Sequence, residues 1–330
     1  MRNSPIRVAR RRPETRRLCL LSSRWEGTPM KSKLLTASAA LALLAAPALA
    51  QDKLKIGMTF QELNNPYFVS MQEALNEAAA SLGADVVVTD AGHDVAKQIS
   101  DVEDMLQQNI DILLLNPTDS AGIEAAVHAA KAAGVTVVAV DANANGPVDT
   151  FVGSKNRDAG YMSCKYLGEA LEGKGEVAIL DGIPVVPILQ RVEGCKAALE
   201  EFPEITLVTT QNGRQDRSVA LGVVENMIQS HPNLAGIFSV NDGGAMGALA
   251  AIQGSGKDIK LTSVDGAPEA VQAIAAGGPF IETTAQFPRD QVRVGLAMAL
   301  AQKWGARVVP KEVPIDVMVV DAENAAEFSW

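Results

Sequence analysis

Polar side chains that can accept hydrogen bonds end several strand-like runs of this sequence. Asp141 ends VTVVAVD, Asp265 ends KLTSVD, Asn241 follows AGIFSV, and Gln286 ends IETTAQ. Carboxylates accept hydrogen bonds from neighbouring hydroxyl groups, and amides both donate and accept them. The four positions together predict a site for a small ligand that carries several hydroxyl groups.

Two adjacent aromatic residues stand where the first strand-like run gives way to a helix. In LNNPYF, Asn65 precedes Tyr67 and Phe68, although aromatic residues make up only 4% of the chain. The apolar C–H faces of a sugar or polyol pack on aromatic rings, so the pair could line the same site. The pair could equally be core residues at a helix start.

The strand-end aspartates also have an ordinary structural interpretation. Asp141 and Asp265 could cap the following helices or form turns. Because the same placement recurs at several strand ends, we favour a ligand-binding role.

The elements that must position these residues alternate along the chain. Continuous apolar runs such as DVVVTD and DILLLN predict strands that are buried on both faces of a parallel sheet. Between the strands the pattern predicts helices at 66–82, 94–108, 120–133, 157–172, 188–201, 215–230, 242–253, 267–276 and 288–302. Short strands are expected near 313–320. The alternation restarts after NANGPVDTFVGS, so the chain holds two doubly wound units.

The fold class predicted is α/β, with two Rossmann-like parallel-sheet lobes and a ligand cleft between them. Ligands of open parallel sheets bind beyond the carboxyl ends of the strands, where the polar residues stand. No low-complexity linker separates the halves, so several short crossings should form the hinge. We expect a first lobe of 51–154 with 287–315 and a second lobe of 155–286 with 316–330.

The N-terminal segment, residues 1–50, is expected to lie outside the folded protein. Residues 1–29 are rich in arginine, and a basic start, an apolar run and the ending Ala48-Leu49-Ala50 follow from Met30. This pattern is typical of a secretory signal peptide at 30–50, with cleavage before Gln51 and a periplasmic product. Met30 is then the expected start of translation.

The charge balance excludes some classes of partner. The first 50 residues hold 10 of the 29 basic residues and two of the 39 acidic ones, which leaves 19 basic and 37 acidic residues and a net charge of −18. So acidic a chain is not expected to bind nucleic acid or an anionic membrane surface.

Two cysteines remain after the signal segment. Cys164 and Cys195 would lie in an oxidising compartment, where a disulfide is plausible. Two separately buried thiols are an equal alternative, since sequence gives no distance.

Several stretches resemble a known family. LNNPYFVSMQEAL, ILLLNPTDS, IFSVNDGGAMGAL, VDGAPEA and TTAQFP are similar, in one register over 54–320, to the ribose-type periplasmic sugar-binding proteins of ABC importers, which are type I periplasmic binding proteins. The resemblance implies two lobes joined by three crossings that close over a sugar. It places ligand contacts at Asn65, Tyr67, Phe68, Asp141, Asn241, Asp265 and Gln286.

The sequence departs from that family at three positions. Ala142 stands where the family has an arginine, and Gln215 stands where it has an aromatic residue. In the loop GIPVVPILQRVEG, Leu189 takes the place of another arginine, next to Gln190 and Arg191. We therefore expect Gln190 and Gln215 as ligand contacts in a pocket that has lost cationic donors and one stacking face. Ribose, another pentose or hexose, a deoxy sugar and a polyol remain open as ligands.

Other motifs carry less weight. GEALEGKG ends in Gly175 where a phosphate-binding loop needs Ser or Thr, and it falls at a helix end. His93, His128 and His231 lack the spacing of metal ligands. No nucleophile with a base is apparent, so no catalytic residue, metal or cofactor is predicted.

The resulting hypothesis is a monomeric extracytoplasmic receptor, not an enzyme. It would capture a small sugar or polyol by hinge closure and deliver it to the membrane permease of an ABC importer. One alternative is a secreted sugar-converting enzyme on the same scaffold. Another is a ligand-sensing partner of a chemoreceptor or sensor kinase.

Overall fold

A computed structural model describes residues 53–330 of the chain. The predicted signal peptide and the residues before it lie outside this range. The described part contains two six-stranded sheets, ordered β11-β5-β4-β3-β1-β2 and β12-β10-β9-β8-β6-β7. Each sheet with its helices is called a lobe below, the first lobe being the one that holds β1.

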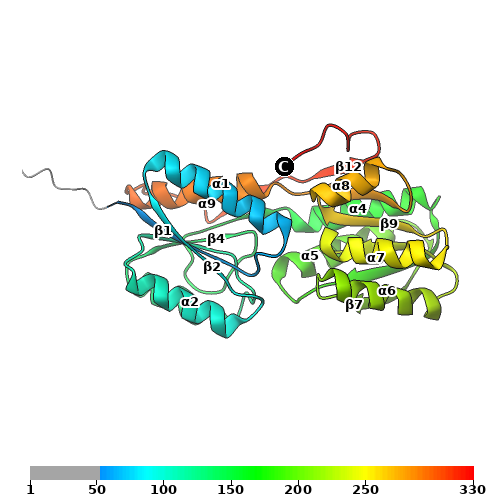
Figure 1. Ribbon diagram of the computed structural model, residues 1–330, viewed down its shortest axis with the longest axis horizontal. Helices are drawn as coiled ribbons and strands as arrows, with labels where there is room; N and C mark the ends of the chain where they lie inside the picture. The colour runs from blue at the N-terminus through cyan, green and yellow to red at the C-terminus, as the bar shows by residue number, and fades with distance from the viewer. Residues whose placement is uncertain (1–52) are drawn as a thin grey trace, which may run out of the picture. The chain divides into compact units, whose positions relative to one another are not determined.

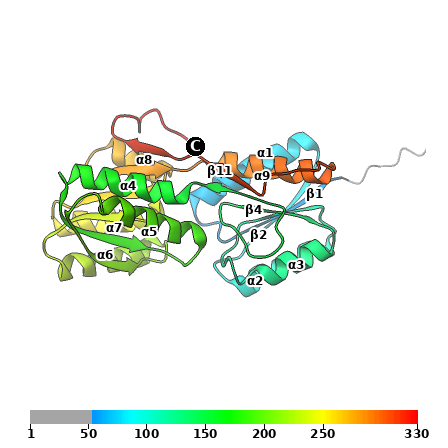
Figure 2. The same cartoon turned by 180° about the vertical axis from the view of Figure 1, so that it is seen from behind.

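The first lobe is built on the first sheet, whose pairings are all parallel. Helices α1 and α9 pack together on one face, and α2 and α3 cover the other (Figures 1 and 2). Its elements are β1 (Lys55–Phe60), α1 (Pro66–Leu82), β2 (Asp85–Asp90), α2 (Val95–Gln107), β3 (Ile112–Leu115), α3 (Glu124–Ala132), β4 (Thr136–Val140), β5 (Thr150–Ser154), α9 (Pro288–Lys303) and β11 (Glu312–Ile315).

The second lobe repeats this plan with one difference at its edge. All its pairings are parallel except that of β10 with β12, which is antiparallel. Helices α4 and α5 cover one face, and α6, α7 and α8 cover the other. Its elements are α4 (Asn156–Ala170), β6 (Lys174–Asp181), α5 (Val186–Leu199), β7 (Glu204–Asn212), α6 (Arg217–Ser230), β8 (Leu234–Ser239), α7 (Asp242–Ser255), β9 (Lys260–Asp265), α8 (Pro268–Ala275), β10 (Phe280–Ala285) and β12 (Met318–Asp321).

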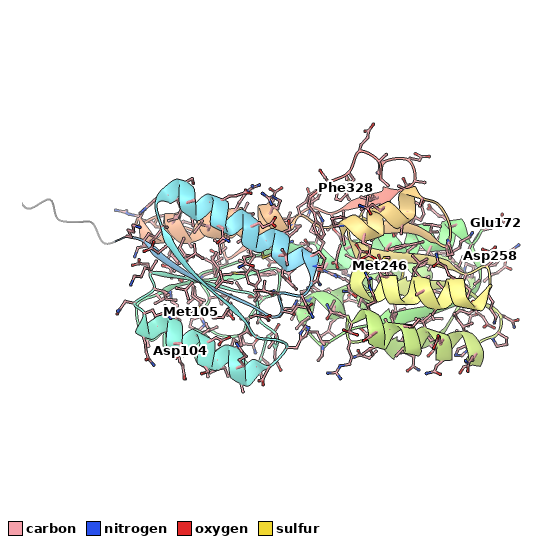
Figure 3. All side chains as sticks on the ribbon, in the orientation of Figure 1. Asp104, Met105, Glu172, Met246, Asp258 and Phe328 are labelled. Carbon is pink, nitrogen blue, oxygen red and sulfur yellow. A yellow bond between two sulfur atoms is a disulfide. The ribbon has the colours of Figure 1, made fainter. Side chains whose placement is uncertain are left out.

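Burial follows the sequence pattern closely. Every residue of the central strands β3 and β4 is buried, as expected for parallel strands covered on both faces. On the amphipathic helix α2, Met105 is fully buried while its neighbour Asp104 is exposed; both are labelled in Figure 3. The α/β class with two parallel-sheet lobes is therefore confirmed.

The sequence pattern missed one strand. The pattern predicts no strand at 150–154, within NANGPVDTFVGS, but these residues form β5, which pairs with β4 and β11. A five-residue run that contains Gly153 gives a weak strand signal. A Cβ at Gly153 would lie 2.4 Å from the Phe151 ring and 3.0 Å from the carbonyl oxygen of Asp141, so only glycine fits there without a shift of its neighbours.

Three short connections join the lobes. They lie between β5 and α4, between β10 and α9, and between β11 and β12. The lobe bounds given above remain a proposal for where each lobe begins and ends.

The second lobe also contains a covalent link. Cys164 of α4 and Cys195 of α5 form a disulfide, with their Cα atoms 4.9 Å apart. Both cysteines are fully buried in the hydrophobic cluster between these helices and the sheet. The link therefore joins two helices that pack against each other on the same face of the sheet.

Candidate functional site

The strand ends of the two lobes meet at a cleft. Its outer part has a volume of about 620 Å³ and is lined by residues of both lobes, among them Glu62 and His93 from the first and Arg214 and Glu269 from the second. Its inner part leaves only about 20 Å³ open, so protein side chains fill most of it. The inner pocket is lined by Gln61, Asn65, Tyr67, Phe68, Asp141, Val185, Pro187, Ile188, Arg191, Gln215, Asp265 and Gln286.

The aromatic pair is both core and lining. Tyr67 and Phe68 are 2% and 3% exposed, and their rings meet edge to face with centroids 5.2 Å apart. Phe68 also packs on Phe60, whose ring centroid lies 6.1 Å away. Asn65 caps α1, because its Oδ1 accepts a hydrogen bond from the Tyr67 amide at 3.0 Å. The cap thus fixes the turn that directs both rings to the pocket.

Asp141 is the acid of the first lobe. It directly follows β4 with a φ of 67°, a left-handed conformation that side chains other than glycine seldom adopt. Its carboxylate accepts hydrogen bonds from the Tyr67 hydroxyl and from the Asn116 amide, both at 3.1 Å. Burial raises the pKa of Asp141 to about 6, against the opposing effects of the Arg191 charge and of these bonds.

Asp265 is the acid of the second lobe. It ends β9 with a φ of 143°, again outside the usual range. Its Oδ1 accepts from Gln286 Nε2 at 2.7 Å and from Arg191 Nη1 at 3.2 Å, and its Oδ2 accepts from the Asp242 amide at 3.3 Å. Burial raises the pKa of Asp265 as well, although the Arg191 guanidinium opposes the shift.

Gln190 lies away from the pocket that the sequence assigned to it. Gln190 is exposed and does not line the pocket, whereas Arg191 is 3% exposed and does. Along α5, Arg191 comes three residues after Ile188 and four after Pro187, so its side chain shares their face toward the cleft. Arg191 brings a guanidinium group to the lining of the inner pocket. It also donates to Asn156 Oδ1 and to the Val240 carbonyl oxygen, each at 2.8 Å.

The other predicted contacts are placed differently from one another. Gln215 is half-buried, lines both parts of the cleft, and accepts a hydrogen bond from the Ile183 amide at 3.3 Å. Gln286 lines the inner pocket and is 1% exposed. Asn241 is equally buried, but it caps α7 and is not among the lining residues.

Four buried amide atoms have no hydrogen-bond partner within residues 53–330. They include Gln61 Oε1, Gln286 Oε1 and Asn241 Nδ2, and the fourth is Gln291 Oε1. The bond from Gln286 Nε2 to Asp265 fixes that amide's orientation, so its oxygen is the free atom. An unpartnered buried polar atom costs free energy unless a ligand or water satisfies it. Two of these amides line the inner pocket and could meet a ligand there.

Sequence reasoning missed further residues of the site. Gln61 follows β1 and Asn116 follows β3, so the strand-end pattern that pointed to Asp141 also applied to them. Asp242, next to Asn241, is buried and accepts from Thr283 Oγ1 at 2.8 Å and from the Ala267 amide at 2.6 Å. Burial, followed by the charge of Asp265, raises the pKa of Asp242 to about 7.

Neither metal binding nor membrane crossing finds support in the described range. Residues 53–330 contain no cluster of three side chains that could hold a metal ion. Within the same residues, no helix combines the length and hydrophobicity that crossing a bilayer requires.

Comparison with known proteins identifies a family whose members are similar to this chain in sequence. The family described as "Periplasmic binding protein domain" matches residues 56–306. The ribose import binding protein RbsB of Bacillus subtilis is 40% identical over 221 residues, which cover 66% of this chain and 72% of that protein. RbsB of Escherichia coli is 32% identical and covers 87% of this chain and 96% of its own length.

A solved structure shares the fold as well. The periplasmic solute-binding protein of an ABC transporter from Actinobacillus succinogenes, with bound D-allose, is 31% identical and gives a TM-score of 0.78. The match covers 84% of this chain and all of that one. These similar proteins are named for binding or import rather than for catalysis.

Proposed function

The chain belongs to the periplasmic binding protein family, and we propose that it is the sugar- or polyol-binding component of an ABC importer. One observation carries this proposal. Asp141 of the first lobe and Asp265 of the second, which end corresponding strands, line the same inner pocket beside Tyr67. A carboxylate from each lobe can thus grip one ligand from two sides.

The chemistry of the lining suits an uncharged ligand with several hydroxyl groups. The two carboxylates and the free oxygens of Gln61 and Gln286 are all acceptors. Ligand hydroxyls would donate to them, while Tyr67 and Phe68 contact the C–H face. Anionic sugars would meet buried carboxylates, and such like-charge contact is costly.

Hinge closure would supply the selectivity. The inner pocket is nearly filled in this conformation, so a ligand must enter while the lobes are apart and replace bonds such as Tyr67–Asp141. Once the lobes close, water is excluded and each unmatched hydroxyl becomes expensive. That cost lets the site distinguish stereoisomers.

The cellular setting completes the proposal. The protein would be exported by the predicted signal peptide, act in the periplasm as a monomer, and present its closed form to a membrane permease. Like its named relatives, which are import binding proteins, it is a binding protein and not an enzyme.

A thermal-shift panel tests the proposal. D-ribose, D-allose and xylitol are compared with D-galacturonate as an anionic probe. A probe at 100 times its dissociation constant should stabilise the protein by about 2.7 kcal/mol. Asp141→Asn and Asp265→Asn should each abolish the shift. Asp258→Asn, at an exposed residue labelled in Figure 3, should keep it. Wild-type shifts in both cleft variants would refute the site.

A further inference from the structure

Trp330 contacts Tyr67 and Asp265 from the segment that follows β12. This segment is held to the second lobe by Asn324, whose Oδ1 accepts from the Asp321 amide at 3.0 Å and whose Nδ2 donates to the Val319 carbonyl oxygen at 2.9 Å. Phe328, labelled in Figure 3, packs on Phe287 with ring centroids 6.4 Å apart. The contacts of Asn324 and Phe328 therefore hold in place the segment that carries Trp330.

The indole N–H supports the backbone of one binding residue. Trp330 Nε1 donates a hydrogen bond to the backbone carbonyl oxygen of Asp265 at 3.1 Å, and the backbone N–H of Gln286 donates to the same oxygen at 2.9 Å. Asp265 has a φ of 143°, a conformation that costs free energy and persists only where the surroundings hold it. The two donors hold the carbonyl that this conformation directs toward them.

The indole ring supports a residue of the other lobe. It meets the ring of Tyr67 edge to face, with centroids 5.8 Å apart and an angle of 82° between the planes. The Tyr67 hydroxyl in turn donates to Asp141 at 3.1 Å and accepts from Gln291 Nε2 at 2.7 Å. Trp330 thus touches the residue that orients Asp141 and the backbone that orients Asp265.

We propose that Trp330 is a positioning residue that holds Tyr67 and Asp265 in register with each other, so that the lobes close on the ligand with both acids in place. Trp330 does not line the inner pocket, so it acts through these two residues. The inference rests on the proposed function. It extends the site to the C-terminal segment, which no strand-end pattern indicates.

Affinity measurements on three variants test the inference. Binding is measured by calorimetry and stopped flow with whichever of D-ribose, D-allose and xylitol gives the largest thermal shift. All variants are studied at a temperature where circular dichroism shows them folded. Trp330→Ala should weaken binding about tenfold, mainly through faster dissociation, because preorganisation is lost. Trp330→Phe keeps a ring against Tyr67 but loses the N–H, so it should weaken binding only about threefold.

Trp304→Ala is the matched control. Trp304 is 75% exposed, so its removal should leave affinity and dissociation rate unchanged. A purely structural Trp330 would lower the melting temperature without changing dissociation in the folded protein. Wild-type affinity in Trp330→Ala would overturn the inference, as would equal losses in the alanine and phenylalanine variants.

A measurement without ligand separates this inference from the proposed function. In ¹⁵N-labelled wild-type protein, the indole N–H of Trp330 should exchange with solvent at least about tenfold more slowly than that of Trp304, because the Trp330 N–H donates a hydrogen bond whereas Trp304 is 75% exposed. Equal exchange rates would contradict the contact with Asp265. If no probe bound wild-type protein, the proposed function would fail, while exchange would still decide whether the contact exists.

Discussion

The two lobes place an aspartate at the same topological position but surround it differently. Asp141 follows β4 and Asp265 ends β9, each the third strand in the order of its sheet, and both have a positive φ. Asp265 forms an ion pair with Arg191, whose side chain is 4% exposed. Among residues 53–330, the donors at hydrogen-bonding distance from the Asp141 carboxylate are neutral, namely Tyr67 and Asn116. The two sheets place an aspartate at the same position, but the side chains of the neighbouring helices determine how its charge is compensated.

The second lobe also buries more acid than the first. Glu282 of β10 is fully buried and accepts from Ser163 Oγ at 2.7 Å and from Thr284 Oγ1 at 2.6 Å. Burial raises the pKa of Glu282 to about 8, so this group is mostly protonated at neutral pH. Arg191 and protonation together limit the charge in this lobe. Within residues 53–330, no cation donates a hydrogen bond to Asp141, although the Arg191 charge lowers its pKa.

Removing the two acids should affect stability very differently. Asp265→Ala leaves the buried Arg191 guanidinium without its carboxylate, and losing one partner of a buried ion pair costs about 3–5 kcal/mol. Asp141→Ala leaves only neutral donors unsatisfied, at about 1–3 kcal/mol, and it also removes a buried charge. Urea unfolding of the ligand-free variants measures both losses. Equal losses would mean that Arg191 does not distinguish the lobes.

The disulfide offers a second test of the same contrast. It closes 31 residues of the second lobe, and losing a cross-link of that span should cost about 3–4 kcal/mol. Cys164→Ala/Cys195→Ala should therefore lower the free energy of unfolding by this amount. Hydrogen exchange should quicken first in α4 and α5. Faster exchange in α1 and α9 instead would show that the first lobe is the weaker one.

A smaller effect should appear as pH dependence. The pKa of Asp141 is raised to about 6 in the folded protein, so the folded state binds a proton more readily than the unfolded chain. Stability from this group is therefore greatest below its unfolded pKa and falls as pH rises through about 6, by about 1–3 kcal/mol in total. Asp141→Asn should remove this part of the slope.

The other buried acids provide the control for the pH dependence assigned to Asp141. Asp242, Asp265 and Glu282 also have raised pKa values. The stability of the Asp141→Asn variant should therefore still fall with rising pH, but less steeply than that of the wild-type protein. Binding should respond in the opposite direction. Protonation of Asp141 below about pH 6 removes an acceptor, so probe affinity should weaken there. An unchanged slope in Asp141→Asn would place the titration elsewhere.

The sequence by itself determined the layered fold and the strand-end acids. Continuous apolar strands alternating with amphipathic helices fix a parallel sheet, and its topology places the residues after β1, β3, β4, β8, β9 and β10 at the carboxyl edges. Asp141, Asp265 and Gln286 could be found in this way because the signal is local.

Only the tertiary structure decided which neighbours complete the site. Arg191 instead of Gln190 faces the cleft because α5 docks by its Pro187–Ile188 face, a choice that depends on packing over the whole lobe. Strand β5 forms because two partners pair with it, and Trp330 reaches Tyr67 from 263 positions along the chain only because the fold returns its last segment to the cleft. Such contacts depend on three-dimensional proximity, which local sequence patterns do not encode.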